Sequence, residues 1–224
     1  MHKVIALIII IVSLDSNLSG QLTFESVALP HDCSIMSLSI SPTGEQYVQL
    51  HGQWSSIYTS MDGQTWTEEQ LNDDYYYPID FIFYEDGTPI LKTDRGPDQL
   101  IIRQDNNWLT LNPLNEMVGF ATAATLSNDT LYCYQSGGVY SSLNKGETFE
   151  LHLQLEESKD IKDIIIYKDL ILLTEEVGGN SLIKTYQNET LINEVQVSRY
   201  ERLYTLGNGE VLLTHLFDEN YNLY

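Results

Sequence analysis

The sequence predicts an all-β protein in which a four-stranded sheet is repeated along the chain. Short alternating or apolar runs separated by turn residues recur throughout, for example Ile35–Ile40, Gln46–Leu50 and Ile57–Ser60. A turn pattern of serine, aspartate or asparagine, glycine and threonine occurs at Ser60 and again at Ser142, 82 positions later. No helical period of useful length follows residue 20. Radial repetition of four-stranded sheets forms a β-propeller.

The spacing of the two turns sets the repeat length. If they are two repeats apart, each repeat has about 41 residues, as expected of a four-stranded blade. A weaker copy lies between them at Leu100–Trp108, and another follows at Ser181–Leu191. The predicted blades are residues 30–71, 78–112, 119–155, 162–197 and 200–224. We expect four and a half to five blades, either as an incomplete ring or as a five-bladed ring closed by Leu22–Leu29.

The residues of the repeated turn are folding devices. The aspartate or asparagine side chain can accept hydrogen bonds from backbone N–H groups of its own turn, and glycine supplies a positive φ. We expect the threonine to begin the return strand and the following aromatic ring to lie under the hairpin. The residues assigned to the two turns are Ser60, Asp62, Gly63, Thr65 and Trp66, and Ser142, Asn144, Gly146, Thr148 and Phe149.

This turn pattern resembles the Asp-box, or BNR, hairpin of a β-propeller superfamily that includes sialidases, sortilin-type receptors and xyloglucan-degrading hydrolases. The resemblance implies that the boxes join the third and fourth strands of a blade, on the face away from the usual ligand entrance. It does not choose among activities. Sialidases hold the substrate carboxylate with three arginines, the first in an Arg-Ile-Pro motif, and this chain lacks that motif. Sialidase activity is therefore not expected.

The first 20 residues predict a secretory signal peptide. A basic start at Met1–Lys3 precedes the apolar run Val4–Val12, which is too short to span a bilayer. Cleavage before Gln21 would leave residues 21–224 as one domain. An uncleaved anchor is the alternative. We expect a secreted or extracellular protein, or a cell-surface one if the chain is part of a longer protein.

Charge and motifs exclude several kinds of function. The formal net charge of −21 disfavours nucleic acid and anionic membranes as partners. The two cysteines, Cys33 and Cys133, fall in repeats that are not neighbours, so we expect buried free thiols more than a disulfide. No zinc, haem, phosphate-loop or serine-nucleophile motif is present, so no metal, cofactor or catalytic residue is assigned.

Ligand-binding residues are expected in the loops opposite the boxes. Tyrosine rings beside carboxylates suit sugars or extended peptides, although the same tyrosines could simply pack against the next blade. The candidate ligand-binding residues are Trp54, Tyr75, Tyr76, Tyr77, Asp94 and Arg95. Asp94 and Glu175 are also candidates for a glycosidase carboxylate pair, for which the sequence spacing gives no direct support.

These observations favour a secreted, non-catalytic β-propeller module that binds a protein, peptide or glycan through its loop face. One alternative is an exported glycoside hydrolase of the sialidase or glucanase type, present here as a fragment. Another is a structural repeat module of a larger surface protein.

Overall fold

The computed structural model describes residues 34–51, 56–69, 71, 77–94, 99–105, 107–111, 123–155, 161–198, 202–205 and 211–214. Every helix or strand assigned in this part of the chain is a β-strand, which confirms the predicted all-β class. The chain divides into two compact units, Met1–Asp74 and Tyr75–Tyr224, and each is described by itself.

The first unit contains one antiparallel sheet, in the order β1-β2-β3-β4. Its strands are β1 (Ser34–Ile40), β2 (Gln46–His51), β3 (Ser56–Ser60) and β4 (Thr67–Glu69). Val48, Leu50 and Tyr58 form a buried core on one face, and Leu38 and Trp66 pack against it. Val48 and Leu50 are two residues apart, so the pleat of β2 places both on the same face.

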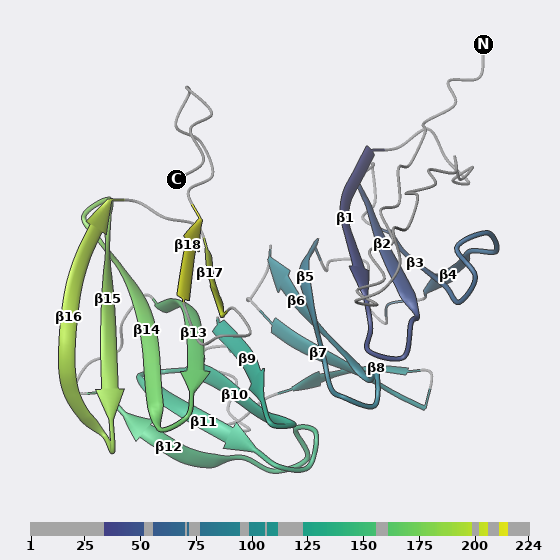
Figure 1. The fold of residues 1–224 in the computed structure, drawn as a ribbon. Helices are drawn as coiled ribbons and strands as arrows, with labels where there is room; N and C mark the ends of the chain where they lie inside the picture. Colours follow the sequence, from purple (N-terminus) through teal and green to yellow (C-terminus); the bar gives the residue numbers. More distant parts are fainter. Residues whose placement is uncertain are drawn as a thin grey trace, which may run out of the picture. The chain divides into compact units, whose positions relative to one another are not determined.

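The second unit contains three further four-stranded antiparallel sheets and one two-stranded sheet (Figure 1). The second sheet contains β5 (Tyr77–Phe83), β6 (Pro89–Asp94), β7 (Gln99–Gln104) and β8 (Asn107–Leu111). The third contains β9 (Ala123–Ser127), β10 (Thr130–Gln135), β11 (Gly138–Ser142) and β12 (Glu150–Gln154). The fourth contains β13 (Ile161–Tyr167), β14 (Leu170–Val177), β15 (Asn180–Gln187) and β16 (Thr190–Ser198), and the last pairs β17 (Arg202–Thr205) with β18 (Val211–Thr214). The predicted four-stranded repeat is confirmed.

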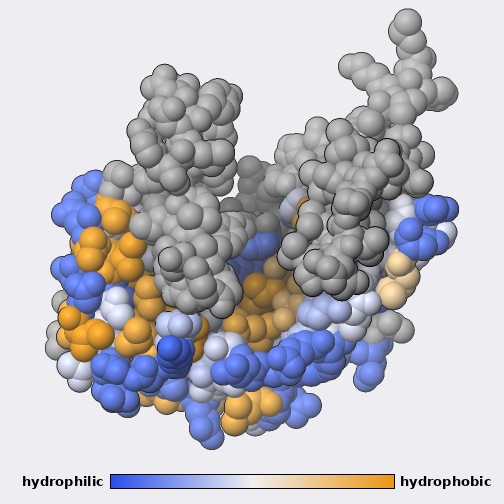
Figure 2. All heavy atoms as spheres, in the orientation of Figure 1, coloured by the Kyte–Doolittle hydropathy of each residue, from blue (hydrophilic) through white to orange (hydrophobic). Residues whose placement is uncertain are grey.

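Successive sheets of the second unit pack face to face through their apolar side chains. The first strands meet, since β9 contacts both β5 and β13, and β13 contacts β17. One core lies between the second and third sheets and contains Tyr84, Ile90, Leu100, Ile102, Leu111, Ala124, Leu131 and Cys133. Another lies between the third and fourth sheets and contains Ala123, Tyr134, Val139, Leu153, Leu155, Ile161, Ile164, Ile171 and Leu173. Hydrophobic side chains also reach the surface over β13–β16, at the left of Figure 2.

The prediction of buried free thiols is confirmed at one of the two cysteines. Cys133 is a free thiol, fully buried in the core between the second and third sheets. Burial raises the pKa of this thiol well above its ordinary value, so it stays protonated at neutral pH. Cys33 lies outside the described residues.

Two-residue turns explain the regularity of the third and fourth sheets. Asn128-Asp129, Ser136-Gly137, Gly178-Gly179 and Asn188-Glu189 each have positive φ at both residues. Such turns match the right-handed twist of the paired strands and favour glycine and asparagine. The local sequence therefore fixes the register of these hairpins.

Candidate functional site

The strand register brings two of the six predicted ligand-binding residues together. Tyr77, the first residue of β5, is the direct cross-strand partner of Asp94, the last residue of β6. Trp54, Tyr75, Tyr76 and Arg95 lie outside the described residues, so their placement stays a prediction.

Each predicted box turn lies at the end of its own sheet opposite to the end where the second strand finishes and the third begins. In an antiparallel meander, the turn after the third strand is at the end where the first strand finishes and the second begins. The Ser142–Phe149 turn between β11 and β12 is accordingly at the end of its sheet away from the β10–β11 turn. We call the end of a sheet where its second and third strands are connected, for example by the β6–β7 or β10–β11 connection, the loop end.

The turn between β3 and β4 is held by the side chain of Asp62. Its Oδ1 accepts hydrogen bonds from the backbone N–H groups of Gln64 at 2.8 Å and Thr65 at 2.7 Å, and from Ser60 Oγ at 3.0 Å. Ser60 Oγ in turn accepts from the Gly63 N–H at 2.9 Å. These hydrogen bonds, led by those from Thr65 and Gln64, lower the pKa of Asp62 to about 2.

The turn between β11 and β12 repeats this network with an amide. Asn144 Oδ1 accepts from Ser142 Oγ at 2.9 Å and from the Thr148 N–H at 3.0 Å, and its Nδ2 donates to Thr148 Oγ1 at 2.9 Å. Ser142 Oγ accepts from the Gly146 N–H at 2.8 Å. The side chains of Ser60, Asp62 and Thr65, and of Ser142, Asn144 and Thr148, therefore hold their own loops.

One expectation about these turns was wrong. The two threonines do not begin the return strands, because β4 begins at Thr67 and β12 begins at Glu150. Instead, each threonine hydroxyl bonds the central aspartate or asparagine, and Thr65 Oγ1 lies 3.2 Å from Asp62 Oδ2. One residue, Trp66 or Phe149, lies between each threonine and the start of the return strand.

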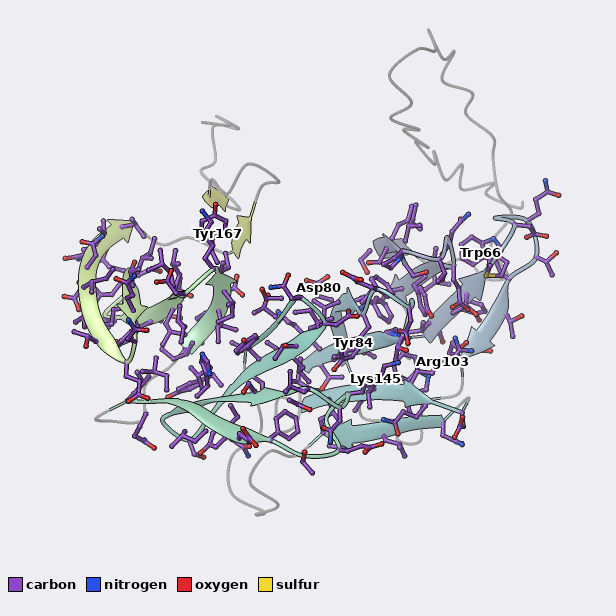
Figure 3. The ribbon with its side chains drawn as sticks, turned by 60° about the horizontal axis from the view of Figure 1, so that its bottom comes forward. Trp66, Asp80, Tyr84, Arg103, Lys145 and Tyr167 are labelled. Carbon is purple, nitrogen blue, oxygen red and sulfur yellow. The ribbon has the colours of Figure 1, made fainter. Side chains whose placement is uncertain are left out.

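Lys145, at the tip of the β11–β12 turn, connects two neighbouring sheets, and sequence analysis missed it. Its Nζ forms an ion pair with Asp86 and donates to Thr88 Oγ1 at 2.9 Å, both in the β5–β6 connection. It also lies 5.5 Å from the centroid of the buried Tyr84 ring (Figure 3). The hydrogen bond from Lys145, followed by those of Thr88, lowers the pKa of Asp86 to about 2. No local pattern signals this contact, because the partners are far apart in sequence.

The next residue makes the same connection by packing. Gly146 has φ +85°, and a Cβ there would lie 2.5 Å from Cδ2 of Leu111, on the last strand of the second sheet. The backbone of the turn therefore rests directly on the neighbouring sheet. Glycine satisfies both the backbone conformation and this close approach.

The second strands carry buried polar residues where they reach the loop end. Gln135 of β10 and Thr174 of β14 are fully buried, and Thr93 of β6 and Glu175 of β14 are almost fully buried. Glu175 Oε2 accepts a hydrogen bond from Lys184 Nζ at 2.6 Å. This ion pair disfavours a role for Glu175 as one of two catalytic carboxylates.

The first strands share an irregularity that the sequence did not reveal. In β1, β5 and β13 the register shifts by one residue just before Ser37, Asp80 and Asp163. Asp80 Oδ1 accepts from the Phe81 N–H at 2.9 Å, and Asp163 Oδ1 accepts from the Ile164 N–H at 3.0 Å. In β5 and β13 these carboxylates thus accept a hydrogen bond from the residue directly after the β-bulge.

Neither a metal-binding cluster nor a membrane-spanning helix is found among the described residues. Among the residues the structure describes, no group of three or more histidine, cysteine, aspartate or glutamate side chains could hold a metal ion. The same residues include no helix long and apolar enough to cross a membrane.

The fold is similar to those of several solved β-propeller proteins. Streptogramin B lyase matches with a TM-score of 0.64 and 15% identity over 87% of this chain and 66% of that chain. Kuenenia stuttgartiensis hydrazine synthase matches with a TM-score of 0.61 and 12% identity over 87% of this chain and 59% of that chain. YCF48 bound to D1 peptide matches with a TM-score of 0.54 and 14% identity over 83% of this chain and 61% of that chain.

These similarities, together with the repeated four-stranded sheets, show that the chain has a β-propeller fold. At such low identity they show the fold alone. The chain spans between 59% and 66% of the length of these three proteins. No protein-family model matches the chain, and no curated protein matches it in sequence.

Proposed function

We propose that the chain is a non-catalytic, Asp-box-type β-propeller module that binds a protein, peptide or glycan at the loop end of its second sheet. The observation that carries this proposal is the pairing of Tyr77 with Asp94. Tyr75 and Tyr76 directly precede Tyr77 in the sequence, and Arg95 directly follows Asp94, which supports including them in the proposed site.

The chemistry of that end fits binding. Tyrosine offers a large apolar ring with a polar tip, and few rotatable bonds have to be fixed when it contacts a ligand. A neighbouring carboxylate can accept hydrogen bonds from sugar hydroxyls or peptide N–H groups. In contrast, Asp62 and Asn144 in the box turns bond within their own loops, and Glu175 is held by Lys184.

Among proteins of similar fold, one gives a precedent for binding and another for a surface location. YCF48 was solved with a D1 peptide bound, and PorZ, matched with a TM-score of 0.58 and 11% identity, is described as a bacterial surface component of the type-IX secretion system. Streptogramin B lyase is the enzymatic precedent on the same fold. Because the same fold occurs in binding proteins and in enzymes, the function depends on the residues at the loop end.

The test is a comparison of two variants on glycan and peptide arrays. The first is the triple variant Tyr75→Ala, Tyr76→Ala, Tyr77→Ala. The second is Leu143→Ala, at the opposite end of another sheet, where the leucine is 84% exposed. We expect array signals of the unaltered chain to disappear in the triple variant and to persist in the control. A ligand whose binding is equal in both variants would contradict the proposed site.

Export is a separate part of the proposal and rests on the charge and hydropathy of residues 1–20. The full chain is to be expressed in a secreting host, followed by mass spectrometry of the protein in the culture medium. A mature amino terminus at Gln21, or within a few residues of it, is the expected result. Retention of Met1 in a membrane fraction would support the anchor instead.

A further inference from the structure

We propose that the outer edge of β16 is a second binding surface, which takes an extended, lysine- or arginine-rich peptide segment as an additional strand. This surface is distinct from the loop end and does not depend on the function proposed above.

The first observation is an unprotected edge. In the sheet order β13-β14-β15-β16, the last strand pairs only with β15 among the described residues. β16 has nine residues, whereas the corresponding outermost strands β4, β8 and β12 have three, five and five. Along a strand, backbone N–H and C=O groups of alternate residues point away from the existing neighbour. A partner strand could therefore pair with a long row of them.

β16 has few of the features that normally prevent an edge strand from pairing with another chain. Natural edges are protected by lysine, proline, bulges or short length. Thr190–Ser198 contains no lysine, arginine or proline. It has one register shift, between Thr185/Asn193 and Tyr186/Leu191, which places Ile192 at a bulge near the hairpin turn. The remaining stretch, residues 193–198, pairs in regular register.

The side chains along this edge are apolar and partly exposed. Leu191, Ile192 and Val195 are 46%, 52% and 45% exposed. Val195 is the direct partner of Ile183 on β15 and so shares its face. Ile183 belongs with Ile165, Leu172 and Val197 to an apolar cluster on that face. Figure 2 shows hydrophobic side chains at the surface over β13–β16. An added strand would extend the apolar cluster by covering Val195.

Charge identifies the occupant. The chain has a formal net charge of −21, so two copies repel each other, while a cationic segment is attracted. Near the edge, Glu194 is half exposed and lies 3.7 Å from Lys184, whose Nζ is closer to Glu175. Glu189, in the adjoining hairpin turn, adds further negative charge. Val195 and Glu194 are consecutive, so they lie on opposite faces of the strand. The favoured partner therefore alternates aliphatic residues, which cover Val195, with lysine or arginine on the face of Glu194.

The experiment uses the full chain and three labelled peptides of the length of β16, followed by fluorescence anisotropy. The probe alternates valine and lysine. The second peptide alternates valine and glutamate. The third has the probe sequence with N-methyl groups on alternate residues, which keep its charge and block strand pairing. At an ionic strength of about 0.15 M, where exposed charges are screened beyond about 8 Å, we expect only the first to bind well.

Matched variants locate the site. Val195→Lys places a cation on the proposed edge, and Leu151→Lys makes a similar change at a 53% exposed leucine on the outermost strand of another sheet. We expect Val195→Lys to weaken probe binding by about tenfold, equivalent to 1.4 kcal/mol, and Leu151→Lys to leave it nearly unchanged. Circular dichroism confirms that both variants are folded.

Three results would overturn the inference. Equal binding of the N-methylated peptide would show that charge alone drives association. Equal affinities of the Val195→Lys and Leu151→Lys variants would place the peptide elsewhere. A dimer of the unaltered chain in light scattering that becomes monomeric in Val195→Lys would show that a second copy occupies the edge.

Discussion

Lys145 in the β11–β12 turn forms an ion pair with Asp86 in the β5–β6 turn, and so connects two neighbouring sheets. The predicted box turn therefore has a role beyond closing its own hairpin. Its polar residues fix the loop, while Lys145 and Gly146 hold the loop against the adjacent sheet.

Replacing Lys145 by alanine should lower the free energy of unfolding by about 1 kcal/mol, because it removes a partly exposed ion pair and a cation–π contact. Lys168→Ala is a matched control, since both lysines have φ of 56° in hairpin turns and both lie over a tyrosine ring, Tyr84 for Lys145 and Tyr167 for Lys168. Chemical denaturation measures both. Equal losses would show that the ion pair with Asp86 contributes nothing to stability.

The same ion pair should persist into strong acid. The folded-state pKa of Asp86, about 2, lies below its ordinary value of 3.8, so its contribution is complete above pH 3.8 and is lost as the pH falls through about 2. We expect the stability difference between the unaltered chain and Asp86→Asn to shrink over that interval. A difference that already vanishes above pH 4 would contradict the assignment.

Gly146→Ala should destabilise the second unit by more than about 1 kcal/mol, because it combines a positive φ with a clash against Leu111. Gly179→Ala isolates the backbone effect, since Gly179 has φ +83° and nothing within 4 Å of its added Cβ. Gly146→Ala should cost clearly more. In a double-mutant cycle with Leu111→Ala, additive losses would exclude the contact.

Asp62 should titrate with a midpoint near pH 2, because its carboxylate accepts backbone N–H groups. Carboxyl NMR titration measures this directly. Ser60→Ala removes one donor and should raise the midpoint. The contribution of Asp62 to the β3–β4 turn is present above pH 3.8 and lost as the pH falls through about 2. A midpoint at the ordinary value would show that the hydrogen bonds do not form in solution.

Lys184→Met should cost about 3 kcal/mol at neutral pH, because it leaves the buried Glu175 carboxylate without its cation. Adding Glu175→Leu should recover most of that loss. Lys162→Met is the control, because its 3.6 Å pair with Glu176 is exposed at both ends. If the two lysine variants lose the same stability, the Lys184–Glu175 pair is not the structural element described here.

The repeat was predictable because its signals are local. Strand alternation, turn glycines and the two turn motifs lie within a few residues, so the four-stranded sheets followed from the sequence. The order of the strands alone places the loop end and the box turn at opposite ends of a sheet. The partners of Lys145 did not follow from the sequence, because they lie 57 and 59 positions away in another sheet.

The sequence predicted where the candidate site lies in the sheet, but not which of its side chains pair with one another. Tyr77 and Asp94 are joined by strand pairing, which sequence patterns report well. The Glu175–Lys184 pair is a diagonal contact across one face of the sheet, since Glu175 is the direct partner of Leu182 and Lys184 that of Leu173, and no local sequence pattern predicts such a contact. That is why Glu175 could be suggested as catalytic before the structure showed its ion pair.

The most direct test of the central claim is hydrogen–deuterium exchange with and without a ligand recovered from the arrays. If the loop end binds, protection will concentrate in residues 72–78 and 93–98. Protection confined to the turns at 60–66 and 142–149, with no change at the loop end, would contradict the account.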